Sequence, residues 1–524
     1  MNDIIPQSIC QIHYHNNTGG VTKVITRYAE IFNGTAPKSI KRNILFCSDI
    51  GTIPSCNSVM ETINIKEANY HSFSTKNSFI KTRDVLVKKL NRHINNLPQP
   101  VLIIGHNLSL GKNCALSAAF AELIKRFEDE QAFHFFSVIH DLAEEGRITL
   151  LQQIRFLEST GIPVWQYLYP AGNVRYVVLN KRNYTLFTEA GFSTALLPNP
   201  LDDMVDSGTL TVRQRKRITE GLLMLSGKDH SCFYPSKPTF FYPVRVISRK
   251  NVLEAIILTC IIHKANLLIG GKGSSSVDKK LYDGIKRFSQ RHRLPVVFDC
   301  ESLKEFLPKN FIRNDTIFSL LYRYCDDCIS TSVSEGFGFA LYEPWLYGRT
   351  VIGRLPLSIS DHEWCDLSHL YTRFDIPASW ISMEDLWRHY HYTQKILGAK
   401  INAGYFKRFQ KRCIKNGMVD FGILTQQLQF SVTEIIIRNI PSSREITKAN
   451  IITEANSRRR IKGTVSEKNR KGLRGALTGR AYRDRVRECF LSVAGSHKKK
   501  AGDRTRFIKY FSSPDYFSAL MTML

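Results

Sequence analysis

The sequence predicts an α/β protein built from two doubly wound parallel sheets. In the first part of the chain, short apolar runs that fit strands, such as residues 9–13 and 101–105, alternate with helical patterns. A second series of alternating strand and helix patterns begins near Phe240. Alternation of this kind is typical of parallel sheets covered by helices.

The first series opens with the strand at residues 9–13, a polar turn at 16–20 and a helix at 21–32. The helix is expected because its apolar residues recur at helical spacing. Later apolar runs are short enough for strands. They are residues 42–47, 101–105, 135–139, 175–179 and 195–197, with helical patterns such as 115–127 and 150–158 between them.

The second series has the same character and ends in helices. Its expected strands are residues 244–247, 266–269, 296–299 and 328–332, and its expected helices are 251–263, 279–292 and 317–325. Three further helices are expected at 384–397, 402–416 and 421–438. Regular patterning fades after Pro441.

A chain of 524 residues is too long for one core, so we expect several units. The segment 202–238 is charged and rich in turn residues, and separates the two series. We expect two α/β domains, then helices that pack back on the body, and a basic, poorly ordered tail. Their bounds are residues 1–215, 216–400, 401–440 and 441–524.

The charge is strongly positive, at +27 overall. Residues 441–524 hold 20 Lys and Arg against 7 Asp and Glu, a net +13, so the folded body is only moderately basic. Such a balance fits nucleic acid, an anionic membrane surface or acidic small molecules as partners.

Twelve cysteines occur without the spacing of a disulfide framework, which favours reduced thiols in a cytoplasmic protein. Residues 1–7 lack the pattern of a signal peptide. The longest apolar run, 252–262, is too short to span a bilayer. We therefore expect a cytoplasmic protein, with peripheral contact at the inner face of the membrane as an open alternative.

The most informative stretch, residues 335–343, reads Glu-Gly-Phe-Gly-Phe-Ala-Leu-Tyr-Glu, so that Glu335 and Glu343 flank Gly336 and Gly338. A glycine turn between a strand and a helix directs backbone N–H groups toward a phosphate. A carboxylate farther into the helix can accept hydrogen bonds from the two hydroxyls of a ribose. The stretch therefore predicts a sugar-nucleotide site.

Two cations lie at the end of a strand of the second series: Arg245 within the strand and Lys250 in the loop that follows it. Both can hold a phosphate, and an arginine can do so with two parallel N–H bonds. Arg249 precedes Lys250, so the sequence leaves open which arginine acts. A solvated basic loop is the alternative for all three.

Weaker features accompany these. Gly19 and Gly20 precede a helix, His140 ends a strand at the edge where α/β sheets bind ligands, and Asn199 lies between two prolines. Each also has an ordinary explanation: a strand–helix turn, a core histidine and a rigid linker.

Six features in this order resemble the retaining glycosyltransferases of the GT-B fold, group 1, also called glycosyltransferase family 4. The resemblance covers roughly the first 440 residues. It rests on the Asn-Thr-Gly-Gly turn at 17–20, His140-Asp141, Leu-Leu-Pro-Asn-Pro at 196–200, Arg245 with Lys250, the glycine turn at 270–273, and Glu335 with Glu343.

The resemblance implies a GT-B fold, with two facing Rossmann-like domains and a C-terminal return helix. It also implies that residues 1–215 form the acceptor-side domain and residues 216–400 the nucleotide-sugar-binding domain. It implies catalytic roles for four residues: His140 and Glu335 at the transferred sugar, and Arg245 and Lys250 at the donor diphosphate. It also implies donor contacts by Gly19, Gly20, Asn199, Gly336, Phe337, Gly338 and, at the ribose, Glu343.

The chain departs from the family pattern at three places. Asn251 replaces the glycine usual after the lysine, and residues 344–350 are bulkier than is common after the second glutamate. The segment after Pro441 has no counterpart. The donor sugar therefore stays open.

Metal binding is not expected. Cys325 with Cys328, Asp202-Asp203 and Asp326-Asp327 could hold a metal only with further ligands that the sequence does not show. We expect no cofactor, because the nucleotide sugar is itself a substrate. Cations and backbone N–H groups would stabilise the leaving diphosphate.

The function expected is a retaining hexosyltransferase that moves a hexose from a nucleoside diphosphate sugar to an acceptor hydroxyl. The acceptor could be a small polar molecule, a polysaccharide or a lipid-linked glycan. The alternative is a nucleic-acid- or membrane-binding protein on a catalytically inactive GT-B scaffold. Nucleic acid is the less favoured partner, because the tail matches no known nucleic-acid module.

Overall fold

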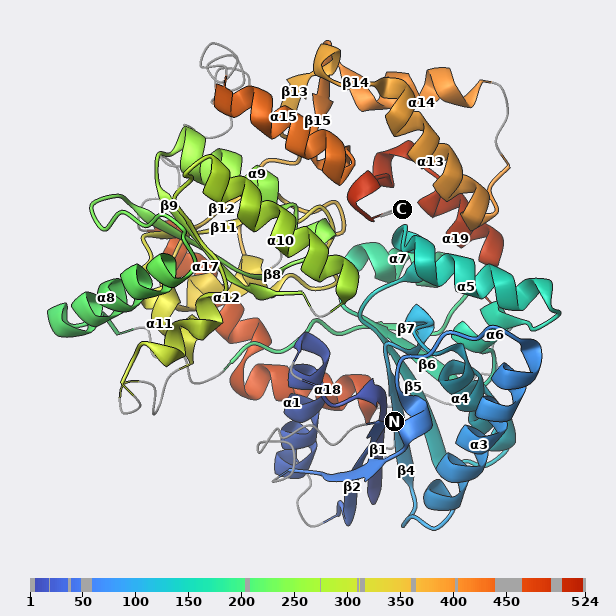
Figure 1. Cartoon of the computed structure of the whole chain (residues 1–524). Coiled ribbons are helices and arrows are strands. Elements are labelled where there is room, and N and C mark those ends of the chain that lie inside the picture. Colours follow the sequence, from blue (N-terminus) through green and yellow to red (C-terminus); the bar gives the residue numbers. More distant parts are fainter. Residues whose placement is uncertain are drawn as a thin grey trace.

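Two parallel sheets face each other across the centre of the molecule (Figure 1). The computed structural model describes residues 5–17, 19–35, 39–48, 59–202, 208–273, 275–308, 311, 316–359, 364–400, 404–438, 464–491 and 502–521.

The first domain is a seven-stranded parallel sheet in the order β3-β2-β1-β4-β5-β6-β7. Its central strands are buried, because helices cover both faces of the sheet. The strands are β1 (Ser8–His15), β2 (Arg42–Ser48), β3 (Glu61–Asn64), β4 (Val101–His106), β5 (Phe133–Ile139), β6 (Val174–Val178) and β7 (Thr194–Leu196). The helices are α1 (Gly20–Thr35), α3 (Lys76–Ile94), α4 (Cys114–Arg126), α5 (Ile148–Ser159), α6 (Val164–Leu168) and α7 (Lys181–Glu189).

The second domain is a five-stranded parallel sheet in the order β10-β9-β8-β11-β12. Its strands are β8 (Thr239–Val246), β9 (Asn266–Lys272), β10 (Val296–Val297), β11 (Asp327–Ser330) and β12 (Val351–Gly353). Its helices are α8 (Val212–Lys228), α9 (Val252–Ile256), α10 (Ser276–Arg291), α11 (Ile317–Tyr324) and α12 (Phe339–Leu346). The α/β class with two facing doubly wound domains is thereby confirmed.

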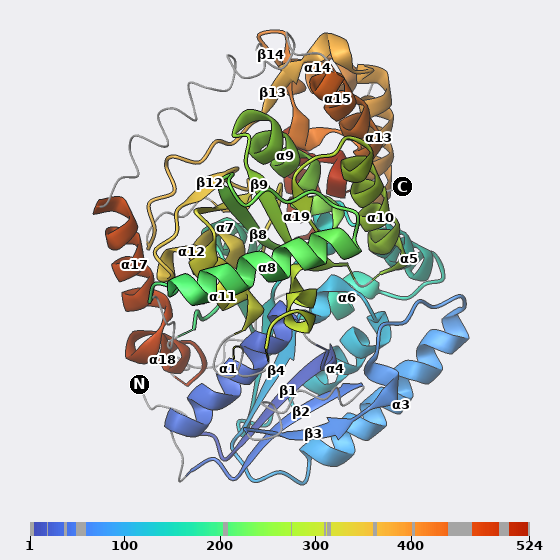
Figure 2. The same ribbon diagram turned by 60° about the vertical axis from the view of Figure 1, so that its left-hand side comes forward.

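The helix α8 straddles the boundary expected at residues 215 and 216. It packs against β10 and the 3-10 helix η6 (Cys300–Glu305), and therefore lies with the second sheet. Figure 2 shows α8 running across this domain. The second unit thus starts near Val212, a few residues before the expected boundary.

The longest apolar run forms α9 and continues as the π-helix η5 (Ile257–Ile262), which is buried under α15 (Gln426–Arg438). Its apolar character reflects burial within the protein. Among the described residues, no helix combines the length and apolarity needed to cross a membrane.

A small antiparallel sheet, β13 (Asp375–Pro377), β15 (Met418–Asp420) and β14 (Ile414–Lys415), follows the second domain. It is accompanied by α13 (Met383–Leu397) and α14 (Tyr405–Cys413). The return contact with the first domain is made by α13, where Arg155 of α5 donates hydrogen bonds of 2.9 and 2.7 Å to the carbonyls of Ile396 and Leu397. The helices expected to pack back on the body were residues 401–440, but α13 lies before residue 401. The helix α15, which lies within that range, packs on α9 of the second domain.

The segment after Pro441 was expected to be poorly ordered, and its described residues contradict this. They form α17 (Thr464–Leu477), α18 (Gly479–Phe490) and α19 (Arg504–Phe511). The helix α17 packs on α12, and α18 packs on α1 (Figures 1 and 2). Two runs of three basic residues in this segment, 458–460 and 498–500, lie outside the described residues.

Aromatic residues explain why these helices dock. Phe490, which is fully buried, contacts Tyr28, Phe32 and Phe136, with ring centroids 5.5, 5.7 and 4.9 Å away. Basic residues of α18 such as Arg483 and Arg487 are exposed, so the positive charge of this segment coexists with an apolar face that packs on the body.

The last described residues reach the second domain. Ser518 Oγ donates a 2.7 Å hydrogen bond to the carbonyl of Gly422. Ser248 Oγ donates one of 2.6 Å to the carbonyl of Leu520. The C-terminal segment therefore contacts the turn that directly precedes Arg249 and Lys250.

Replacing Phe490 by Ala should lower the free energy of unfolding by about 3–5 kcal/mol, because a large buried ring is lost from a tight cluster. Denaturant unfolding of the whole chain measures the change. Phe156→Ala is the matched control, since this ring is 40% exposed, and should cost far less. Equal losses in both variants would contradict the docking of α18.

Candidate active site

Glu335 joins two turns at the carboxyl edge of the second sheet. It lies in the turn after β11, whereas Arg249 and Lys250 lie in the 3-10 turn η4 (Ser248–Lys250) after the neighbouring strand β8. Lys250 Nζ forms an ion pair with Glu335 Oε1, and Arg249 Nη1 lies 3.1 Å from Glu335 Oε2. Arg249 also donates a 2.8 Å hydrogen bond to the carbonyl of Ser334. The two turns are thus held together at the edge where open α/β sheets bind ligands.

Burial and charge act against each other on Glu335. Burial raises the pKa of Glu335, but Lys250 and Arg249 outweigh it and hold the pKa below its usual value. Burial also lowers the pKa of Lys250, which the Glu335 carboxylate opposes. The turn pair therefore carries two cationic side chains against one carboxylate, and can accept a further anion.

Arg245 lies apart from this pair. It is an exposed residue of β8, beside Gly271, and the structure does not bring it to Glu335. Its charge acts instead on Tyr70 of the first domain, where burial raises the pKa of the hydroxyl and Arg245 is among the cations that oppose the rise. Arg249 is the arginine that pairs with Glu335.

Gly336 brings the two domains into direct contact. A Cβ at this position would lie 2.1 Å from the carbonyl oxygen of His140, so only glycine fits this approach. Asn180, which caps α7, donates a 2.8 Å hydrogen bond from Nδ2 to the carbonyl of Gly336. The turn is thereby fixed against two carboxyl ends of the first sheet.

The rest of the glycine turn leads into α12. Gly338 has φ of 90°, a left-handed conformation that glycine adopts without strain, and directly precedes the helix. Phe337 is 4% exposed and packs on Phe339 and Tyr342. Its side chain therefore belongs to the core, and what it can offer a donor is its backbone.

Glu343 projects from α12 toward the first domain. Its Oε1 lies 2.9 Å from Lys23 Nζ, and its Oε2 accepts a 3.2 Å hydrogen bond from the Tyr322 hydroxyl. Lys23 also pairs with Asp202 at 3.1 Å. A carboxylate has about four acceptor positions, so Glu343 can accept ribose hydroxyls besides these two partners.

Gly20 begins α1 close to α12. A Cβ built on Gly20 would lie 3.8 Å from the ring of Phe339, whereas Gly19 is close only to its own turn. The N-terminus of α1 thus meets the glycine turn of the other domain, near Glu343. Anions are favoured at helix N-termini because backbone N–H groups are free there.

Asn199 lies in the linker between the domains. It is 4% exposed, and its buried Oδ1 has no hydrogen-bond partner within the described part of the chain. The preceding Pro198 carbonyl accepts a 2.7 Å hydrogen bond from the Tyr482 hydroxyl of α18. The C-terminal helices therefore cover this linker.

His140 ends β5 and is almost completely buried, with 5% exposure. Burial lowers the pKa of His140 to about 4, against the opposing effect of Asp141, so the imidazole is neutral at neutral pH. Its buried Nε2 has no hydrogen-bond partner among the residues described. A neutral ring nitrogen in this state suits a hydroxyl group of a ligand.

Asp141, the next residue, belongs to the His140-Asp141 motif of the sequence but was given no role of its own. Arg147 Nη2 lies 2.8 Å from Asp141 Oδ1. Burial would raise the pKa of Asp141, but Arg147, Arg249, His140 and Lys250 together lower it to about 2. Asp141 therefore adds a charged link between the two domains.

Sequence reasoning also missed Arg147, Lys23 and Tyr322. Asp141 could have been suggested because it follows His140 in the sequence. Arg249, which precedes Lys250, was already an alternative to Arg245. No sequence signal marks the other three, because their partners lie in distant elements.

The structure shows why asparagine is tolerated at position 251, where the family usually has glycine. Its φ of 53° is left-handed, which is where glycine is usual and where asparagine is tolerated. Its amide also makes hydrogen bonds of 2.6 Å to Glu254 Oε2 and 2.8 Å from Gln429. This departure from the family pattern therefore preserves the turn that presents Lys250.

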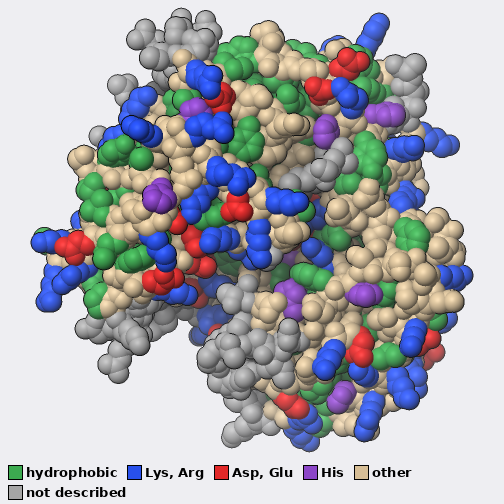
Figure 3. Space-filling model, viewed as in Figure 1, with side chains coloured by type: hydrophobic (Ala, Val, Ile, Leu, Met, Phe, Trp, Pro, Cys, Tyr) green, Lys and Arg blue, Asp and Glu red, His purple; other side chains and the backbone are tan. Residues whose placement is uncertain are grey.

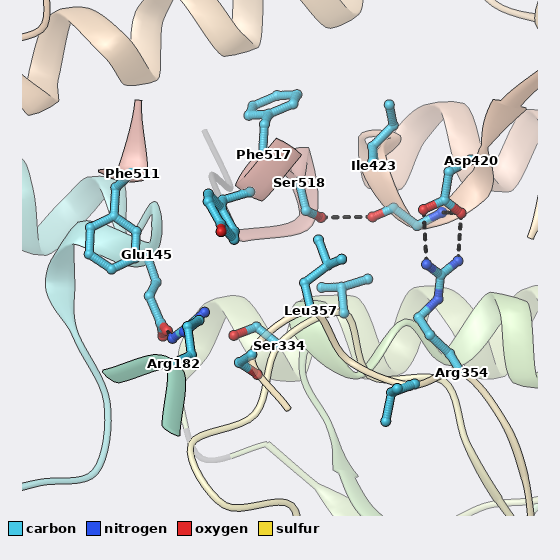
Figure 4. Close-up of a pocket in the computed structure, with 15 residues that line it drawn as sticks. Glu145, Arg182, Ser334, Arg354, Leu357, Asp420, Ile423, Phe511, Phe517 and Ser518 are labelled. Atoms are coloured by element: carbon cyan, nitrogen blue, oxygen red, sulfur yellow. Dashed lines mark hydrogen bonds and ion pairs between the residues drawn. The ribbon is translucent and has the colours of Figure 1, made fainter. Parts of the chain in front are cut away.

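Figure 4 shows a cavity behind the Glu335 turn, between Ser334, Arg354 with Asp420, and the C-terminal segment. The cavity holds only about 30 Å³, enough for a water molecule and too little for a sugar. Arg354 Nη2 lies 2.6 Å from Asp420 Oδ1 and 2.7 Å from Glu254 Oε2. The residues that line this cavity therefore support the turn that carries Glu335.

Among the described residues, no group of three or more His, Cys, Asp or Glu side chains is arranged to hold a metal. Cys325 and Cys328 are buried free thiols with sulfurs 3.8 Å apart. Asp326 accepts a hydrogen bond from the Thr239 backbone, and Asp202 pairs with Lys23. Asp203 lies outside the described residues.

Comparison with known proteins adds distant similarities. No protein-family model matches the chain. The chain is 22% identical over 429 residues to mannosylglucosyl-3-phosphoglycerate synthase of Petrotoga mobilis, covering 80% of this chain and 79% of that protein.

Two solved structures are similar at TM-scores below 0.5. Sucrose-phosphate synthase from Thermosynechococcus elongatus has 14% identity and a TM-score of 0.45, over 67% of this chain and 82% of that one. The catalytic domain of starch synthase IV from Arabidopsis thaliana, bound to ADP and acarbose, has 10% identity and a TM-score of 0.44, over 86% and 99%.

The buried His140 predicts a pH dependence of stability. Because the pKa of His140 is lowered to about 4 in the fold, the unfolded chain binds the extra proton first as pH falls below about 6.5. The free energy of unfolding should therefore fall by up to about 1.4 kcal/mol per pH unit from this residue, between about pH 6 and 4.5. Urea unfolding of wild type and His140→Asn measures it: the variant should show a shallower fall, and parallel slopes would contradict the assignment.

Proposed function

We propose that this protein is a glycosyltransferase that transfers a hexose from a nucleoside diphosphate sugar to an acceptor hydroxyl, with retention of the anomeric configuration. The observation that carries the proposal is the pairing of Lys250 and Arg249 with Glu335, beside Gly336 and His140. Two cations, a glycine turn and a neutral histidine thereby meet where the two domains touch.

The second domain would hold the donor. Arg249, Lys250 and the backbone N–H groups of the turn at Gly336 and Gly338 would bind the diphosphate, and Glu343 would bind the ribose. Glu335 and His140 would contact the hexose. The contact of Gly336 with the carbonyl of His140 supports this, because it brings the first domain against the turn that carries Glu335.

In the reaction, the bond between the hexose anomeric carbon and the diphosphate oxygen breaks, and a bond from the acceptor oxygen to that carbon forms. The acceptor proton passes to the leaving phosphate oxygen on the same face of the sugar, so no separate protein base is required. Negative charge develops on the diphosphate, and preorganised cations stabilise it there. Contact between the domains excludes water that would otherwise hydrolyse the donor.

Similarity supports the reaction class at a distance. The relative of Petrotoga mobilis is named as a synthase of a mannosylglucosyl compound, and the similarity spans most of both chains. That name fits an enzyme that forms a glycosidic bond. The order of motifs from the first domain to Glu343 supports donor binding independently of it.

The alternative of a basic binding protein on an inactive scaffold is less well supported. The described part of the C-terminal segment is folded onto α12, α1 and the 3-10 turn η4, and its apolar residues serve that packing. The expected site residues around Glu335 also keep charges and geometry suited to a diphosphate. We therefore give the segment a structural role in this proposal.

Transfer is proposed to need no divalent cation, because Arg249 and Lys250 can supply the positive charge. The test is transfer or donor hydrolysis by purified protein in excess chelator, with the anomeric product followed by NMR. Activity that is kept under chelation and gives a retained product supports the proposal. Loss of all activity on chelation, restored by added Mg²⁺, would contradict the metal-free mechanism.

Glu343→Ala should weaken nucleotide binding by about 10- to 100-fold, since hydrogen bonds to a charged group contribute about 1.5–3 kcal/mol. Thermal-shift titration with UDP-, ADP- and GDP-sugars first identifies the nucleotide that binds wild type. Calorimetry with that nucleotide then compares the variants. Glu130→Ala, an exposed glutamate of the first domain, is the control and should bind as wild type does; equal binding by Glu343→Ala would remove the ribose role.

A further inference from the structure

The first domain brings two cations of its own to the site. Lys112 follows β4 and Arg147 follows β5, which is the neighbouring strand. Arg147 forms the ion pair with Asp141, and a Cβ built on Gly336 would lie 3.8 Å from the same Asp141 oxygen. The two cations therefore lie at the carboxyl edge of the first sheet, on the opposite side of the domain contact from Lys250.

Both cations have hydrogen-bonding capacity that the described residues leave unused. Lys112 forms no ion pair with a described residue, and its Nζ lies over the ring of Tyr70, 4.8 Å from the centroid. The Nε of Arg147 is buried and has no hydrogen-bond partner among the described residues. Buried donors are normally satisfied, so a ligand oxygen is the natural partner for this one.

The positive charges of Lys112 and Arg147 are only partly balanced by nearby carboxylates. Burial lowers the pKa of Lys112, the positive Arg147 lowers it further, and Asp141 and Asp278 oppose the change. Asp141 is also shared with Arg249 and Lys250. In Figure 3, Lys and Arg side chains gather on the left-hand lobe beside the hollow between the two lobes, with some Asp and Glu among them. An anion placed here would relieve repulsion between cations.

The donor does not account for these two cations. Its diphosphate is proposed to lie on the second domain, where Arg249, Lys250 and the glycine turn match its charges. Lys112 and Arg147 project from the other sheet, on the side left for the acceptor. Tyr70, which is 47% exposed, adds an aromatic face next to Lys112 that could pack against the carbon face of a sugar.

We propose that the acceptor is an anionic molecule, carrying a phosphate or a carboxylate, and that Lys112 and Arg147 bind this group. The inference rests on the proposed glycosyl transfer and adds the chemical class of its acceptor. Charge-assisted hydrogen bonds from Lys112 and from the Arg147 Nε would hold the anion, so that the acceptor hydroxyl faces the donor across the domain contact. Neutral acceptors lack this anchor.

Three compounds with one three-carbon skeleton provide the probes: glycerol, glycerate and glycerol 3-phosphate. Each is titrated by calorimetry into the full chain, both alone and with the donor site saturated by the nucleotide that binds best. We expect saturable binding of the phosphate, the carboxylate or both in the presence of nucleotide, and none of glycerol. Binding of only one anion identifies the group. If nucleotide binds but neither anion does, the inference is overturned.

Variants separate this site from the donor site. Lys112→Met and Arg147→Gln should each weaken binding of the anionic probe by about tenfold or more, as expected for a lost charge-assisted hydrogen bond. Lys88→Met changes an exposed lysine on α3 of the same domain and should leave probe binding unchanged. Equal probe binding by wild type and both site variants would contradict the inference. Absence of nucleotide binding in wild type would instead count against the proposed glycosyl transfer.

Discussion

The ion pairs of Glu335 with Lys250 and Arg249 are the constraint on which the rest of the site depends. They join turns from two neighbouring strands, and the Glu335 side chain is only 6% exposed. Removing three charged groups from water is costly, so such a cluster contributes little to stability by itself. Its effect here is to hold two cations in one place, where Glu335 pairs with both and Asp141 of the first domain also acts on them. Two cations fixed at the edge of the sheet favour a diphosphate as ligand.

The same cluster lies at the junction of all parts of the chain. Gly336, next to Glu335, meets the carbonyl of His140, so the first domain closes on this turn. From behind, Ser248 is bonded to the carbonyl of Leu520, and Ser518 to that of Gly422. The C-terminal segment therefore braces the cationic turn and, through Tyr482, also covers the linker between the domains. Any movement of the two domains must be compatible with these contacts of the C-terminal segment.

Much of the fold could be predicted from local patterns. Apolar runs and helical spacing gave both sheets, and parallel topology then brings the turns after β8 and β11 together at one edge, as expected for Lys250 and Glu335. The helices α17 and α18 were missed because their short apolar faces are buried by distant partners such as Tyr28. Arg249, and not Arg245, lies beside Glu335, because Arg245 is still an exposed residue of β8 whereas Arg249 lies in the 3-10 turn after it. Residue spacing alone does not specify this difference. Contacts across the domains, such as Lys23 with Glu343, carry no local signal.

The most direct test of the central claim is a crystal structure of the protein with a nucleoside diphosphate bound. We expect an oxygen of the terminal phosphate to lie within about 3 Å of Lys250 Nζ or an Arg249 nitrogen, with the ribose at Glu343. A diphosphate bound away from these cations, with the pairing of Lys250 and Glu335 undisturbed and no ligand near Gly336, would contradict it.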